Sequence, residues 1–146
     1  MSESPYPTRL AALLSDLESI EDRDERSDYL IETAARFRGI PEHIAKRPYQ
    51  ESHRVPGCES EAFIFSEAAD GAGVKFYFAV ENPQGISAKA LAVVLDETLS
   101  GCSPQEIQNV NEDIVHSIFG ATVSMGKGQG LMGMVRMTKA LARAAS

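Results

Sequence analysis

The sequence predicts a small α+β domain in which helices cover one side of a small antiparallel β-sheet. Two helical patterns come first along the chain, two strand patterns follow, and the second half is helical again. Strands and helices do not alternate one by one, as they do in proteins with a parallel sheet. The chain has 146 residues, so we expect one domain that spans residues 1–146.

The first two helices are predicted from apolar residues at helical spacing. In the first helix these residues run from Leu10 to Ile20, and Thr8 is the candidate N-cap. The charged segment 21–28 is predicted to form a turn and the first turn of a second helix, which ends near Gly39. We expect the second helix to bury the following side chains: Tyr29, Leu30, Ala34 and Phe37.

A long loop and a hairpin are predicted next. Three prolines, at positions 41, 48 and 56, predict an extended loop up to residue 57. Residues 60–68 and 73–81 are rich in β-branched and aromatic side chains and are separated by an Asp70-Gly71 turn signal. This pattern is typical of an antiparallel hairpin.

Three helices are predicted between the hairpin and residue 120. The segment 87–101 has one apolar face and ends at a glycine. The sequence "SPQE" at 103–106 is a capping box with proline at the first helical position, so it predicts the start of a short helix. Another short helix, within residues 111–120, is expected to end at Gly120.

The last element is predicted as a helix from about Leu131 to Ala144, preceded by a glycine-rich loop, "SMGKGQG", at 124–130. The spacing of these glycines differs from the GxxxxGK[ST] pattern of phosphate-binding loops. We therefore predict a flexible loop with a helix start and no phosphate site.

Composition excludes several classes of function. The formal net charge is −7, from 14 basic and 21 acidic residues, and such a surface repels nucleic acid and anionic lipid. No apolar stretch approaches the roughly 20 residues that span a bilayer. The N-terminal segment "MSESPYPTRL" lacks the apolar region of a signal peptide. We expect a cytoplasmic protein with no nucleic-acid or membrane partner, and reduced thiols at its two cysteines.

Cys58 is the candidate reactive residue. It follows Pro56 and Gly57 directly before a strand, where a side chain is accessible. A reactive cysteine also needs help to ionise, because the thiolate is the nucleophile. His53 and Arg54 are the candidate sources of positive charge, while two nearby glutamates oppose them. On the residues alone, Cys58 is either a functional thiol or an inert one.

Metal and hydrolytic sites are not predicted. A zinc site needs about four ligands at set spacing, and the three histidines and two cysteines form no such motif. No histidine can be paired with Cys58 by spacing, as a hydrolytic active site would require. Cys102 is predicted at the C-terminal end of a helix, where the helix dipole disfavours a thiolate, and is interpreted as structural or incidental.

Several motifs together resemble the SufE family, the sulfur acceptors of cysteine desulfurases. The most specific is V-x-G-C-x-S at residues 55–60, followed by the strand. The segments "SPQEI" and "GKGQGLMGMVRMTKAL" add to the likeness, in the same order, over nearly the whole chain. Lys127 stands where the family commonly has an arginine. The resemblance implies a fold shared with IscU-type scaffold proteins.

The resemblance also implies a function and a set of partners. Cys58 would take a persulfide sulfur from a SufS-like cysteine desulfurase, stimulate that enzyme, and pass the sulfur to a SufBCD-like iron–sulfur scaffold. The chain itself would be no enzyme and would hold no cofactor or metal, since pyridoxal phosphate belongs to the desulfurase. Lys127, His53 and Arg54 would contact the partner. The expected oligomeric state is a monomer or weak dimer.

Two further expectations concern Cys58 in the free protein. A persulfide is easily reduced or oxidised, so Cys58 should be partly or largely buried, with Val55 and Phe63 packing near it. Lys127 should lie on the rim of the same site. The alternative functions are a thiol-based redox enzyme or sensor, which needs a resolving thiol or reductant, and an inert structural thiol. A cluster scaffold is excluded because two cysteines supply too few ligands.

Overall fold

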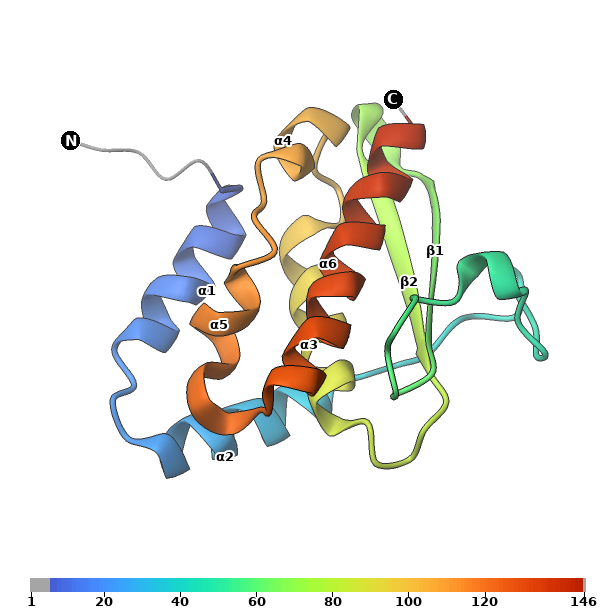
Figure 1. The fold of residues 1–146 in the computed structure, drawn as a ribbon. Coiled ribbons are helices and arrows are strands. Elements are labelled where there is room, and N and C mark those ends of the chain that lie inside the picture. Colours follow the sequence, from blue (N-terminus) through green and yellow to red (C-terminus); the bar gives the residue numbers. More distant parts are fainter. Residues whose placement is uncertain (1–5, 146) are drawn as a thin grey trace.

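The computed structural model describes residues 6–145 and has the predicted order of helices, hairpin and helices (Figure 1). The first half contains α1 (Thr8–Glu18), α2 (Arg23–Ala34), β1 (Ala62–Ala68) and β2 (Val74–Val80). The second half contains α3 (Ile86–Leu99), α4 (Pro104–Gln108), α5 (Ile114–Phe119) and α6 (Met125–Ala144). The α+β class predicted from the sequence is confirmed.

The two strands form one antiparallel hairpin in which Ala62 faces Val80 and Ala68 faces Val74. Side chains alternate between the two faces of a sheet. One face buries Ile64 of β1 and the phenylalanines 76 and 78 of β2 in the main core. The opposite face carries Phe63 and Phe65, so the hairpin is apolar on both sides.

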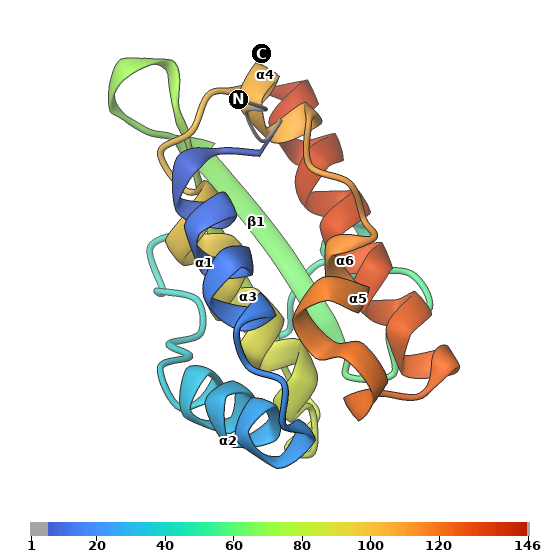
Figure 2. The ribbon, with the colours of Figure 1, turned by 90° about the vertical axis from the view of Figure 1, so that its left-hand side faces the viewer.

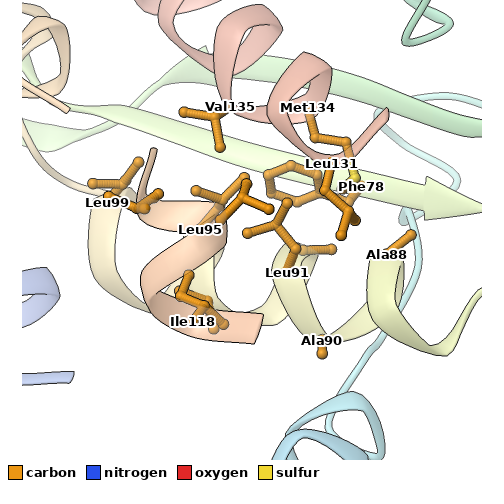
Figure 3. Close-up of a cluster of buried hydrophobic side chains, with 14 of the residues drawn as sticks. Phe78, Ala88, Ala90, Leu91, Leu95, Leu99, Ile118, Leu131, Met134 and Val135 are labelled. Carbon is orange, nitrogen blue, oxygen red and sulfur yellow. The ribbon is translucent and has the colours of Figure 1, made fainter. Parts of the chain in front are cut away.

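The central helix of the core is α3, which the other helices and the sheet surround. It contacts α1, α2 and α6 and lies on β2, and Figure 2 shows α1 and α2 in front of it with the sheet behind. Figure 3 shows Leu91 and Leu95 of α3 pointing toward Leu131 of α6. Because α3 buries residues all round, its sequence is more apolar than that of a surface helix.

The α-helices cover only the core face of the sheet, as predicted. The opposite face is covered by the loop 40–54, drawn in cyan and teal at the right of Figure 1. The contacts come from apolar side chains of this loop: Ile40, Ile44, Ala45 and Tyr49. The proline-rich segment is therefore the second cover of the sheet as well as the path to Cys58.

Several helix boundaries differ from the prediction, and local hydrogen bonds explain them. The N-cap of α1 is Pro7, where Thr8 was expected. Thr8 is instead the first residue of the helix, and no side chain caps the helix start. Helix α2 ends at Ala34, before Gly39, because the amides of Arg36 and Phe37 turn back to the carbonyls of residues 33 and 34.

The helix starts in the second half show one confirmation and one error. The capping box is confirmed, since the Glu106 amide donates to the Ser103 hydroxyl at 3.2 Å and the Ser103 amide donates to the Glu106 carboxylate. The glycine-rich loop prediction is wrong, because residues 125–130 are the first turns of α6. Ser124 caps this helix by accepting from the Lys127 amide at 3.3 Å.

Candidate functional site

Cys58 lies at the tip of a loop that two turns hold in place. The bridge between Arg54 and Phe63 closes the loop, and the Val55 amide donates to the Ala62 carbonyl at 2.8 Å. In the first turn the Cys58 amide faces the Val55 carbonyl at 3.5 Å. Proline and glycine occupy its two central positions, and Gly57 has φ of +73°, the residues and conformation of a type II turn.

The second turn begins at Cys58, whose carbonyl accepts from the Glu61 amide at 3.2 Å. Cys58 is thus the last residue of one turn and the first of the next. The loop is also joined to the chain after β2, because the Asn82 amide donates to the Ser60 carbonyl at 3.1 Å. The Asn82 side chain adds a bond to the Glu59 carbonyl at 3.3 Å. These bonds set the backbone position of the thiol.

Glycines of α6 let this helix approach the Cys58 loop at backbone distance. A Cβ atom on Gly130 would lie 3.2 Å from the Cys58 Cα and the Gly57 carbonyl oxygen. A Cβ atom on Gly133, one turn further along, would lie 3.3 Å from the Pro56 carbonyl oxygen. Gly130, one of the glycines that suggested a loop, and Gly133 therefore form a flat helix face against the Cys58 loop.

A cavity of about 130 Å³ lies beside Cys58. Its walls come from the Cys58 loop at residues 58–60, the connection to α3 at 82–87, and the start of α6 at 126–131. All three segments meet at the lower end of the sheet in Figure 1. Cys58 is half-buried and packs against the main core cluster. The expected partial burial of Cys58 is confirmed.

Two helices begin at this cavity, and Lys127, in the first turn of one of them, lines it together with Cys58. Gly85 and Ser87 belong to the first turn of α3, and Gly126 and Lys127 to that of α6. The N-terminal end of a helix carries a partial positive charge. Within residues 6–145, the Lys127 ammonium has no ion-pair partner, and Glu59 is the one carboxylate on the cavity wall. The structure thus places Lys127 on the rim of the site.

His53 and Arg54 do not line the cavity, and their side chains lie against the outer face of the sheet. His53 stacks on Phe65 with ring centroids 3.9 Å apart, and its Nδ1 hydrogen-bonds to the Ile64 carbonyl at 2.8 Å. The Arg54 guanidinium lies over Phe63 on the outer face of the sheet. It donates twice to Glu51, and this hydrogen bonding holds the pKa of the Glu51 carboxyl below its ordinary value.

Cys102 lies at the other end of the hairpin. Its carbonyl accepts from the Val74 amide at 3.1 Å, next to the first residue pair of β2. Cys58 precedes the opposite end, where Ala62 faces Val80. Strands of 7 residues separate the two ends by about 20 Å at roughly 3.3 Å per residue. Both cysteines are free thiols, and geometry keeps them apart.

The sequence analysis missed three polar residues of the cavity wall. Asn82, Gln84 and Ser87 line it from the connection between β2 and α3. Their sequence context, around Pro83 and Gly85, indicates only a turn. Residue type alone therefore held no signal for these positions.

Searches for metal and membrane features over residues 6–145 add two findings. No three His, Cys, Asp or Glu side chains in this range are grouped so as to hold a metal ion. No helix in the same range has the length and apolarity needed to cross a membrane.

The fold and the site define a small α+β protein with one half-buried thiol at a loop tip. The family model described as "SufE: Fe-S metabolism associated domain" matches residues 11–142, and the chain belongs to the SufE family. A similar solved structure is the solution structure of a hypothetical protein from Thermus thermophilus. It has 26% sequence identity and a TM-score of 0.74, over 96% of this chain and 97% of that one. A comparison with curated proteins returned no match.

Proposed function

We propose that the chain is a sulfur carrier that accepts a persulfide sulfur on Cys58 and delivers it to iron–sulfur cluster assembly. Membership of a family associated with Fe-S metabolism supports the general role. The observation that carries the proposal is the placement of Cys58 at a loop tip beside a cavity that contains Lys127. Cys102 does not line this cavity; its Sγ lies 3.9 Å from the Arg9 guanidinium and donates to the Thr98 carbonyl at 3.6 Å.

The transfer step is a displacement at sulfur. The Cys58 thiolate attacks the terminal sulfur of a persulfide on the donor protein, and a new S–S bond forms at the Cys58 Sγ. The S–S bond of the donor breaks, and its cysteine leaves as a thiolate. Each atom and electron is accounted for, so the step needs no oxidant, reductant or cofactor on this chain.

The donor in this proposal is a SufS-like cysteine desulfurase, and pyridoxal phosphate in that enzyme releases sulfur from free cysteine. The acceptor is a SufBCD-like scaffold. The chain activates the desulfurase by removing its persulfide and catalyses no complete reaction alone. The cavity shelters the bound sulfur from water, and Lys127 offers positive charge to the partner surface. The whole process belongs to the cytoplasm.

The redox alternative is less well supported by the geometry. A peroxidatic cysteine is regenerated by a resolving thiol or an external reductant. Cys102, the other cysteine of the chain, lies at the opposite end of the hairpin from Cys58. An internal disulfide between the two would require the fold to open.

Intact-mass analysis tests the proposal. The protein is incubated with a SufS-like desulfurase from the same organism and free cysteine, without reductant. The wild type and Cys102→Ser should each gain one sulfur atom, and Cys58→Ser should gain none. Sulfur that appears on Cys102 alone, or no gain in the wild type, would refute the assignment.

A further inference from the structure

Exposed apolar side chains are few in the described structure, and two of them belong to the starts of the helices that form walls of the cavity. Within residues 6–145, three large hydrophobic residues are exposed: Ile31 at 54%, Ile86 at 49% and Met125 at 84%. Ile86 is the first residue of α3, and Met125 is the first residue of α6. Their chain neighbours on both helices line the cavity that holds Cys58.

We propose that Ile86 and Met125 are the apolar anchors through which the cysteine desulfurase docks over Cys58. This inference rests on the proposed function and adds the residues that determine recognition. Lys127 lies on the same rim, two residues after Met125. The matching partner surface has apolar recesses around its persulfide and an acidic or carbonyl group that faces the ammonium.

The position of the thiol requires contact at this rim. Cys58 is half-buried, so the donor sulfur has to come to the mouth of the cavity for the two sulfur atoms to meet. Any protein surface that comes so close covers the first residues of the cavity walls. The starts of α3 and α6 form two of these walls, so an interface that covers the mouth of the cavity extends over the helix starts to which Ile86 and Met125 belong.

The residue types suit an anchoring role. A single exposed apolar side chain is common on protein surfaces, but a pair flanking one cavity is a local concentration. Methionine is flexible and fits irregular recesses. Apolar anchors near the centre of an interface supply much of the binding energy, while surrounding polar contacts exclude water. Lys127 adds charge steering, which acts mainly on the association rate.

Desulfurase titration tests this inference. Alanine formation from free cysteine is measured as a function of the concentration of the chain, for Ile86→Ser and Met125→Ser. Each variant should raise the half-saturating concentration about tenfold, equal to roughly 1.4 kcal/mol of lost binding, and leave the plateau rate unchanged. Ile31→Ser is the matched control, since it makes the same change as Ile86→Ser at a residue of similar exposure on α2, and it should behave like the wild type.

A second measurement separates docking from thiol chemistry. Loading of Cys58 by the small donor cysteine persulfide should be equal in all four proteins, because no docking surface is involved. If Ile86→Ser and Met125→Ser reach half-saturation at the wild-type concentration and sulfur transfer is normal, this inference is refuted and the proposed function stands. The inference is also refuted if Ile31→Ser raises the half-saturating concentration as much as Ile86→Ser and Met125→Ser do. If the wild type receives no sulfur from the desulfurase, the proposed function fails, and this inference fails with it.

Discussion

Substituting Gly130 by alanine tests whether the glycine face of α6 positions the Cys58 loop. The new Cβ would lie 3.2 Å from two backbone atoms, the Cys58 Cα and the Gly57 carbonyl oxygen. Backbone cannot rotate away as a side chain does, so the loop has to move by a few tenths of an ångström. Alanine gains about 1 kcal/mol of helix propensity over glycine, and overpacking costs about 1–3 kcal/mol.

Gly128→Ala is the matched control for this substitution. It makes the same change in the same helix, but beyond the adjoining helix backbone no atom lies within 4 Å of the new Cβ. Gly128→Ala should therefore raise the free energy of unfolding by about 1 kcal/mol. The free energy of unfolding of Gly130→Ala should be lower than that of Gly128→Ala by about 1–3 kcal/mol, which is the steric cost of overpacking. Urea denaturation measures both values.

Alkylation of Cys58 gives a second readout of the same displacement. Gly130→Ala pushes the loop away from α6, so the thiol should react faster with iodoacetamide than in Gly128→Ala. A Cys102→Ser background restricts the label to Cys58. Equal stability and equal alkylation rates in the two variants would refute the reasoning that α6 positions the thiol.

Two further predictions concern charged groups. Lys127→Glu should weaken desulfurase stimulation more at low salt than at high salt, because an exposed rim charge of roughly 1 kcal/mol or less is screened. Lys127→Arg should preserve stimulation, and equal stimulation by the wild type and Lys127→Glu at every salt concentration would remove Lys127 from the site. At the other end of the sheet, the hydrogen bond to Glu67 raises the pKa of Tyr77 from 10.0 to about 12. The folded phenol holds its proton to higher pH than the unfolded one, so this stabilisation is present below pH 10 and is lost as the pH rises toward 12. Glu67→Gln should return the pKa of Tyr77 toward 10.0, as seen by ultraviolet titration of tyrosinate absorbance, and an unchanged titration would contradict the assignment of the shift to Glu67.

Local signals in the sequence predicted those elements whose causes are themselves local. The capping box at Ser103 and Glu106 needs only four successive residues, and the helix forms there. The hairpin follows from two β-rich segments and an Asp-Gly turn, and the strands have nearly the predicted bounds. Cys58 was found through its proline-glycine turn, which the structure contains.

The errors come from interactions between distant parts of the chain. The start of α6 was assigned to a loop because glycine disfavours a helix. Packing of Gly130 and Gly133 against residues 55–58 reverses this preference, and it joins segments that are far apart in the sequence. His53 and Arg54 were expected to supply charge beside Cys58 because they are near it in the chain, and their contact with a partner stays a prediction. The turn of the backbone before β1 places both against the outer face of the sheet.

The order of the cavity walls along the chain has a consequence for the newly made protein. Two of the walls, at residues 58–60 and 82–87, are synthesised well before the third, at 126–131. A ribosome adds about 5–20 residues per second, so for several seconds the nascent chain contains Cys58 without the helix that covers it. Oxidants and metal ions therefore have their easiest access to this thiol during translation. The protein acquires its shelter only when α6, the last described helix, folds onto the loop.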